Sequence, residues 1–293
     1  MSSNCQGAAR CHDAVRLRYV PASSWIAWLV AWRLVSSPPD MPRSGSGSRR
    51  TSRAQRTIVA CQGLPILSKL CPAAIFRALR WALPSGHRAY PTRAGRLYLD
   101  VSESLTMLMR VLRMYEPAKH RALDQVLRPG MTFLDVGACK GDFTVFAAVR
   151  VGPLGRVVAI EPEPANVRSL RMSIARNRVH NAEVHEMALS DASGRGILHV
   201  DVLKIDVEGW EVPVLRGARH TLGEIHPILL MDLHPDLGVN PGTIAEILHD
   251  HHYETFHMDA PAEPLEVRRD TVEILARPRP RDDVRVHDRS TLR

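Results

Sequence analysis

The sequence predicts an α/β fold in which helices cover both faces of a doubly wound, mostly parallel sheet. Strand-like and helix-like segments alternate from about residue 130 onward, and the strand-like segments are near-continuous apolar runs, such as Arg156–Ile160. A glycine-rich turn follows the first of these strands. Two late strands with little helix between them predict that the sheet ends with an antiparallel strand.

Two amphipathic helices are expected before the sheet begins. Apolar residues recur at helical spacing from Leu105 to Leu112, and again from Leu123 to Leu127. Pro129-Gly130 is a typical end for the second of these helices.

The strands and helices of the sheet then follow in a regular order. The expected strands are 132–136, 156–160, 183–189, 202–207, 228–233, 254–258 and 271–276. The expected helices are 143–149, 164–177, 211–222 and 243–249. Because ligands of such sheets bind beyond the carboxyl ends of the strands, the residues that follow each strand form the candidate site.

The segment before the first helix has a different composition. Residues 1–60 are basic and rich in Arg, Ser and Pro, and are expected to be disordered because they contain too little apolar surface to bury. Residues 61–102 are expected to be a partly helical lead-in, with an amphipathic stretch over 64–83. An alternative is that the basic segment is an upstream extension and that the working protein starts at Met41 or later.

The folded domain is expected to span residues 103–278, and residues 279–293 are expected to be a disordered tail. Charge separates this domain from the lead-in. The net charge is +8, but residues 1–100 hold 15 Lys and Arg against 3 Asp and Glu, whereas residues 101–293 hold 24 against 28. A nucleic-acid substrate would need the basic surface on the catalytic face. The mildly acidic domain therefore favours a small or neutral substrate.

Cysteine usage favours a reducing, cytoplasmic location. The five cysteines are irregularly spaced and contain no C-x-x-C pair, which fits neither a disulfide framework nor a zinc site. The apolar run Trp25–Trp32 is far shorter than the roughly 20 residues that span a bilayer, so no stable membrane insertion is expected. The run could instead be the core of a signal peptide, although Ser36-Ser37-Pro38-Pro39 offers no clear cleavage site.

The turn after the first strand reads Asp135-Val-Gly137-Ala138-Cys139-Lys-Gly141-Asp142. Its glycines allow the backbone to approach a ligand and turn tightly into a helix. A dinucleotide fingerprint would need glycine at positions 139 and 142, and Asp142 would repel a pyrophosphate at the helix N-terminus. Asp135 and the backbone of Gly137, Ala138 and Gly141 suit a cationic sulfur ligand better. The turn therefore predicts S-adenosylmethionine as the cofactor.

Two further positions are candidates for cofactor binding. Glu161 follows the second strand, where a carboxylate can accept hydrogen bonds from both ribose hydroxyls. A purely structural carboxylate before the next helix is the alternative. Ser190-Asp191 follows the third strand, at the place expected for an adenine contact, although the same residues also suit a simple turn.

Several ordered motifs resemble those of the FkbM-family methyltransferases. The similarity covers roughly Arg93 to Pro235. It is carried by Tyr115-Glu-Pro117, Phe133-Leu-Asp-Val-Gly-Ala138, Gly155-Arg-Val-Val-Ala-Ile-Glu-Pro162, Ala188-Leu-Ser-Asp191, Lys204-Ile-Asp-Val-Glu-Gly209 and Leu215-Arg-Gly-Ala218.

This resemblance implies a class I methyltransferase fold, which is Rossmann-like, and S-adenosylmethionine-dependent O-methylation. The implied acceptor is a hydroxyl on a sugar, polysaccharide or other small natural product. Nucleic-acid methylation is disfavoured, since Asp206-Val-Glu-Gly209 stands where base-amine methyltransferases carry an Asp/Asn-Pro-Pro-aromatic motif. Oligomeric state stays open.

Three residues are candidates for the catalytic chemistry. Asp206 and Glu208 end the fourth strand, where carboxylates can orient the methionyl amine of the cofactor, hold the acceptor hydroxyl or bind a hard cation. Capping of the next helix is the alternative. His234 follows the fifth strand and is the candidate general base, because imidazole titrates near neutrality. A structural histidine fits equally well, and no metal ligand is assigned.

The chain departs from the family between the third and fourth strands. Only 11 residues, Asp191 to Asp201, join two parallel strands that are not neighbours. They can reach about 36–40 Å, more than the roughly 22 Å needed, but no crossover helix fits. The sequence therefore predicts a fold shortened between strands 3 and 4, with one sheet face bare. A weakly active or catalytically silent binding protein is the corresponding alternative function.

Overall fold

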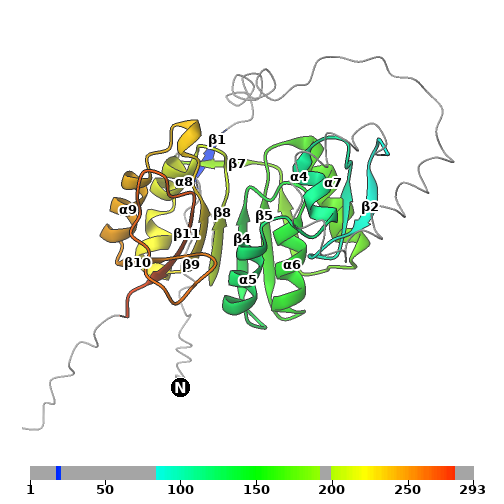
Figure 1. Cartoon of the computed structure of the whole chain (residues 1–293). Helices are drawn as coiled ribbons and strands as arrows, with labels where there is room; N and C mark the ends of the chain where they lie inside the picture. The colour runs from blue at the N-terminus through cyan, green and yellow to red at the C-terminus, as the bar shows by residue number, and fades with distance from the viewer. Residues whose placement is uncertain (1–17, 21–83, 192–198, 281–293) are drawn as a thin grey trace, which may run out of the picture.

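The computed structural model describes residues 18–20, 84–191 and 199–280 (Figure 1). Within these residues a seven-stranded sheet has the order β10-β11-β9-β8-β4-β5-β6. Its strands are β4 (Thr132–Val136), β5 (Arg156–Ile160), β6 (Ala182–His185), β8 (Val202–Ile205), β9 (Ile228–Asp232), β10 (Tyr253–Phe256) and β11 (Glu273–Pro278). The adjacent strands β6, β5, β4, β8 and β9 are parallel, whereas β11 is antiparallel to both β9 and β10. The predicted fold class is confirmed.

Helices cover both faces of this sheet (Figure 1). They are α4 (Leu105–Val111), α5 (Pro117–Val126), α6 (Asp142–Val151), α7 (Pro164–Arg176), α8 (Glu211–Gly217) and α9 (Pro241–Asp250). One core lies between the sheet and α4, α5 and α6, and a second lies between the opposite face and α8 and α9. Burying each apolar side chain of these cores contributes about 1.5–3 kcal/mol.

The predicted helix over 211–222 is shorter in the structure. It ends at Gly217, and a π-helical turn, Thr221–Ile225, follows after a short break. A β-carbon at position 217 would lie 2.2 Å from the backbone oxygen of Ser190. Glycine at this position therefore allows a passing strand to pack directly against the end of α8.

That passing strand corrects the prediction of one continuous strand over 183–189. The chain leaves the sheet after His185 and forms β7 (Ala188–Ser190), which pairs antiparallel with β1 (Arg18–Val20). Leu189 and Val200 belong to the same core as Val158 and Ile160, which are buried. The predicted bare sheet face is therefore wrong, because a strand covers it in place of a helix.

A hairpin precedes the first helix, where the sequence predicted a partly helical lead-in. Its strands are β2 (Arg88–Pro91) and β3 (Arg96–Leu99), and β3 packs on the end of α7. The Asn177 side chain accepts from the Arg96 amide at 2.8 Å, and the Ser173 hydroxyl oxygen accepts from the Tyr98 amide at 2.9 Å. The amphipathic stretch over 64–83 lies outside the described residues.

The segments expected to be disordered are also largely outside the described residues, apart from 18–20 and the first two residues of the tail. In the part of the chain that the structure describes, no helix is long and apolar enough to cross a bilayer.

Candidate active site

The carboxyl ends of four neighbouring parallel strands meet at one edge of the sheet. Val136 of β4 is in register with Ile160 of β5 and with Ile205 of β8, which is in register with Met231 of β9. The loops that follow these strands therefore start side by side. Most of the side chains predicted to form the site belong to these loops.

Gly137 lets two of these loops touch. Its φ is +80°, and a β-carbon there would lie 1.8 Å from the backbone oxygen of Asp206. The amides of Gly137 and Ala138 both donate to the carbonyl of Ile160, at 2.9 and 3.0 Å. Glycine is required here because any side chain would separate the loop after β4 from the loop after β8.

Gly141 has the same function at the start of α6. Its φ is +90°, and a β-carbon would lie 2.6 Å from a methyl group of Leu170 in α7. Next to it, Asp142 is buried beside His120, with Oδ2 3.5 Å from Nε2, and burial raises the pKa of its carboxyl. The turn is therefore compact, and an acid stands at the helix N-terminus.

Glu161 is held in place by the loop after β4. Its Oε2 accepts from the amide of Cys139 at 2.8 Å, and its Oε1 accepts from the Glu163 amide at 3.0 Å and from the Asn166 side chain at 3.1 Å. Burial raises the pKa of this carboxyl, and these hydrogen bonds oppose the rise. Of about four acceptor positions on a carboxylate, one remains, on Oε2, for a ligand hydroxyl.

Cys139 stands in the left-handed region, with φ 50°, and is buried enough that desolvation raises the pKa of its thiol to about 11. The side chain is therefore a neutral thiol at physiological pH and a poor nucleophile. Its backbone amide, bound to Glu161, links the turn to the second strand.

Asp135 is committed to partners inside the protein. Its carboxylate is fully buried, accepts from the hydroxyl of Thr144 at 2.6 Å and lies 3.0 Å from Nζ of Lys204. Lys204 also donates to the carbonyl of Gly137 at 2.9 Å. These contacts stabilise the turn from inside the protein. They do not support the predicted direct contact of Asp135 with a ligand.

Ser190 and Asp191 lie at the end of β7. The backbone oxygen of Ser190 lies against Gly217, at the C-terminal end of α8. The contact of these two residues with adenine stays a prediction.

Asp206 lies between two lysines at the end of β8. Its Oδ2 is 3.7 Å from Nζ of Lys204 and 4.0 Å from Nζ of Lys119. Burial opposes ionisation of Asp206, but the two ammonium groups outweigh it and lower the pKa of this carboxyl to about 2. Asp206 is therefore an anion at every physiological pH.

Asp206 belongs to a cluster of charged side chains that also contains Lys119, Glu116 and Asp232. Sequence reasoning missed these last three residues. The Lys119 ammonium is fully buried, lies 2.5 Å from Oε2 of Glu116 and forms an ion pair with Asp232. Burial and the charge of Asp206 raise the pKa of the Asp232 carboxyl to about 8, against the opposing effect of Lys119. Asp232 precedes His234 by two residues, and Glu116 lies within the Tyr115-Glu-Pro117 motif, so both were within reach of a sequence search.

His234 forms a pair with Glu211, which sequence reasoning considered only as the start of a helix. The His234 Nδ1–H donates to Oε1 of Glu211 at 2.7 Å, and Nε2 lies 3.9 Å from Oδ1 of Asp206. Glu211 is fully buried and also accepts from the Gly209 amide at 3.1 Å. The hydrogen bond between His234 and Glu211 raises the pKa of His234 to about 8, against the effect of burial.

Glu208, the third candidate catalytic residue, lies on the surface in the same loop, with φ 46°. Desolvation and the nearby Asp206 raise the pKa of its carboxyl. The loop thus places Asp206 inside the group and Glu208 at its outer edge.

Two groups of side chains have the composition of a metal site among the described residues. In the first, Glu116, Asp206 and Asp232, the Lys119 ammonium already supplies a positive charge. The second consists of His87, Asp100 and Glu103.

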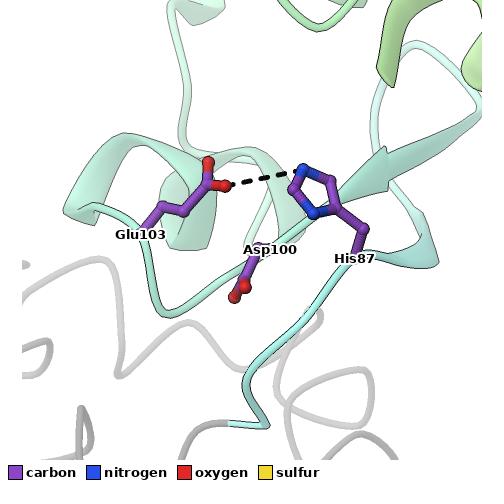
Figure 2. A group of neighbouring side chains, drawn as sticks. All are labelled: His87, Asp100 and Glu103. Carbon is purple, nitrogen blue, oxygen red and sulfur yellow. Dashed lines mark ion pairs between the residues drawn. The ribbon is translucent and has the colours of Figure 1, made fainter. Parts of the chain in front are cut away.

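Figure 2 shows that second group, with His87 Nε2 3.5 Å from Oε1 of Glu103. Its carboxylates have other partners. Asp100 accepts from the amides of Gly86 and Ser102, and Glu103 Oε2 lies 3.3 Å from Nζ of Lys140. These contacts are enough to stabilise the turn that follows the hairpin, and they require no metal ion.

Three solved structures illustrate what the fold is similar to. An S-adenosylmethionine-dependent O-methyltransferase from Thermotoga maritima is 17% identical, with a TM-score of 0.44, over 68% of this chain and 79% of that one. A similar methyltransferase from Aquifex aeolicus is 18% identical, with a TM-score of 0.40, over 54% and 88%. A Streptococcus mutans protein in complex with SAH is 13% identical, with a TM-score of 0.39, over 54% and 94%. No curated protein matches the chain.

A family comparison is more specific. The family described as "Methyltransferase FkbM domain" matches residues 135–199 and 176–260, which together run from Asp135 to Ala260 and contain the loops after β4, β5, β8 and β9. The glycine turn and the buried Glu161, with its remaining acceptor position, suit the cofactor of such a domain. Residues 135–260 of the chain therefore form a methyltransferase FkbM domain, and S-adenosylmethionine is its methyl donor.

Proposed function

We propose that the protein methylates a hydroxyl group, with His234 as the general base that accepts the hydroxyl proton. The observation that carries the proposal is the hydrogen bond between His234 and the buried Glu211. The acceptor class, a hydroxyl on a sugar, polysaccharide or natural product, follows from the family resemblance.

Methyl transfer makes limited demands on the protein. When bound, S-adenosylmethionine supplies a methyl group that its sulfonium already activates. The protein must hold donor and acceptor in line and remove one proton from the acceptor. A base within reach of the acceptor is therefore the chemical group to look for.

His234 has the arrangement of such a base. Because Nδ1 carries the proton donated to Glu211, Nε2 is the basic nitrogen of the neutral ring. Nε2 lies on the side of Asp206, at the edge where the strand ends meet. A pKa of about 8 makes the ring a stronger base than an ordinary histidine, while a useful fraction stays neutral near pH 7 to 8.

The cofactor would be held by the loops around this base. The backbone of Gly137, Ala138 and Gly141 would lie along the donor, and Oε2 of Glu161 would accept from a ribose hydroxyl. Asp206, an anion beside two lysines, would orient the methionyl amine. Glu208 at the outer edge would contact the acceptor hydroxyl.

The surface next to His234 suits a substrate with a ring. Trp210 is 39% exposed and Leu237 is 46% exposed, and Leu237 contacts the turn at Gly209. Aromatic side chains with one apolar face in solvent are common at binding surfaces. These side chains support an organic acceptor of small or glycan type.

A catalytically silent binding protein is not favoured. The short connection after β6 was the reason for that alternative, but β7 covers the sheet face that was expected to be bare.

The test is a methyl-transfer assay with radiolabelled S-adenosylmethionine over a panel of glycans and hydroxylated natural products. We expect a product heavier by one methylene unit, with the label in an ether. His234→Asn is expected to lower kcat by about 10²–10⁴-fold. His249→Asn, a substitution at an exposed histidine, should leave kcat unchanged. Label on nitrogen or carbon, or full activity of His234→Asn, would contradict the proposal.

A further inference from the structure

The side chain of Arg110 is a buried cation without an ion-pair partner among the described residues. It lies in the last turn of α4 and is 5% exposed. Its Nε has no hydrogen-bond partner, and Nη1 reaches only the sulfur of Met107, at 3.9 Å. A buried guanidinium without an anion is costly, so Arg110 is a candidate for binding an anion.

The nearest acids are already engaged elsewhere. Glu116 is bound to Lys119 at 2.5 Å, and Asp142 lies beside His120. Both carboxylates act on Arg110 through their charge, but neither lies within ion-pair distance of it. An anion from outside the described chain is therefore the best partner for the guanidinium.

The position of Arg110 indicates which anion this is. The guanidinium stacks on the ring of Tyr115, 3.7 Å from its centroid, and Tyr115 packs against Phe143 in the first turn of α6. Cys139, in the turn before α6, is another neighbour of the Arg110 guanidinium. The amide of Cys139 is bound to Glu161, so Arg110 and the predicted ribose carboxylate both neighbour the cofactor turn.

We propose that Arg110 binds the methionyl carboxylate of S-adenosylmethionine. A guanidinium presents two parallel N–H donors to a carboxylate, and such charge-assisted pairs are strong and directional. The methionyl end of the donor carries one carboxylate and one ammonium. Arg110 would take the first, and Glu116 or Asp206 would take the second.

This inference rests on the donor assigned above, but not on the identity of the acceptor. A carboxylate on the acceptor is the other source of the same chemistry. The two are distinguished by a donor analogue that lacks only the carboxylate, decarboxylated S-adenosylmethionine.

The experiment measures binding by isothermal titration calorimetry, without acceptor. Wild-type protein is expected to bind S-adenosylmethionine about 10- to 100-fold more tightly than the decarboxylated analogue. Arg110→Met should bind both compounds with about the affinity that the wild type has for the analogue. Arg113→Met, which removes an exposed arginine three residues later, should keep the wild-type preference.

Three results would overturn the proposal. They are an undiminished preference in Arg110→Met, an equal loss of affinity for both compounds in that variant, and a wild type that does not distinguish the compounds. The last comparison needs no variant, so it holds even if Arg110→Met fails to fold. If the preference is found but no hydroxyl acceptor is methylated, the proposed function fails while the role of Arg110 stands. If S-adenosylmethionine does not bind at all, both fail.

Discussion

Glu211 Oε1 lies 2.7 Å from Nδ1 of His234, and Glu211 is fully buried at the start of α8. A buried carboxylate therefore fixes the tautomer of a histidine at the end of the neighbouring strand. The same hydrogen bond is the main reason why the pKa of His234 is raised to about 8.

The pH dependence of kcat should report this pair. Because the base form of His234 is neutral, we expect kcat to rise about tenfold per pH unit below pH 8 and to level off above it. Glu211→Gln removes the charge that favours the protonated ring, so the midpoint should move down by about one pH unit. Rates measured from pH 5.5 to 9.5 check both expectations. Glu224→Gln, at an exposed acid, should leave the midpoint in place, and an unmoved midpoint in Glu211→Gln would contradict the assignment.

The stability of the protein should carry the same signature. The folded pKa of His234 is raised above the ordinary value of 6.5, so its contribution is fully present below pH 6.5 and is lost as pH rises through 8. A shift of this size corresponds to about 2 kcal/mol. Urea unfolding of wild type and His234→Asn should therefore differ by about 2 kcal/mol more at pH 6 than at pH 9.5. An equal difference at both pH values would show that the histidine is not paired in the folded state.

The sequence predicts the sheet far better than the route of the chain between its strands. Thr132–Val136 and Arg156–Ile160 were predicted with their observed bounds, because a central parallel strand is apolar on both faces. The run 183–189 looks equally continuous, yet the chain turns after His185 and β7 leaves the sheet. Pairing of β7 with residues 18–20, about 170 positions away, has no local pattern that a sequence reading could detect.

The candidate site was also predicted only in part from the sequence. Loop residues after strands were found because strand ends converge by rule, and Gly137, Glu161, Asp206 and His234 are there. Lys119 was missed because a lysine in an amphipathic helix is ordinarily solvated, and only the packing of α5 on the sheet buries it.

Gly137 should tolerate no side chain. Gly137→Ala places a β-carbon 1.8 Å from a backbone oxygen, so the two loops must separate, and we expect a loss of more than about 4 kcal/mol in the free energy of unfolding. Gly130→Ala is the matched control, since Gly130 has a similar φ of +86° but open space around it. It should cost only the backbone strain of about 1–2 kcal/mol. Equal losses in the two variants would mean that strain, and not the contact with Asp206, requires Gly137.

Lys119 should act as the internal cation of the acidic group. Burial works against its charge, but Asp232, Asp206 and Glu116 keep the pKa of the ammonium raised. Lys119→Met leaves these carboxylates without their counter-charge, and we expect a loss of about 3–5 kcal/mol in unfolding free energy. Millimolar Mg²⁺ should restore part of the melting temperature, because the emptied group offers three oxygen ligands.

Lys140→Met is the control for this effect. Lys140 is also buried, but it pairs with the single carboxylate of Glu103. Its loss should be smaller and insensitive to Mg²⁺. A Lys119→Met protein as stable as wild type, or one that Mg²⁺ does not affect, would count against the role of the ammonium.

Glu161 should recognise the ribose of the donor through its remaining acceptor position on Oε2. We expect Glu161→Gln to bind S-adenosylhomocysteine about 10- to 100-fold more weakly, since a charged acceptor for a hydroxyl is lost. Loosening of the Cys139 loop could lower affinity in the same way, so a second ligand is needed. The 2′-deoxy analogue should bind the wild type more weakly than the parent compound, but Glu161→Gln should not distinguish the two. Glu163→Gln, which changes the N-terminal cap of α7, is the control and should still bind the 2′-deoxy analogue more weakly than the parent compound. If Glu161→Gln also binds the analogue more weakly than the parent compound, Glu161 does not contact the ribose.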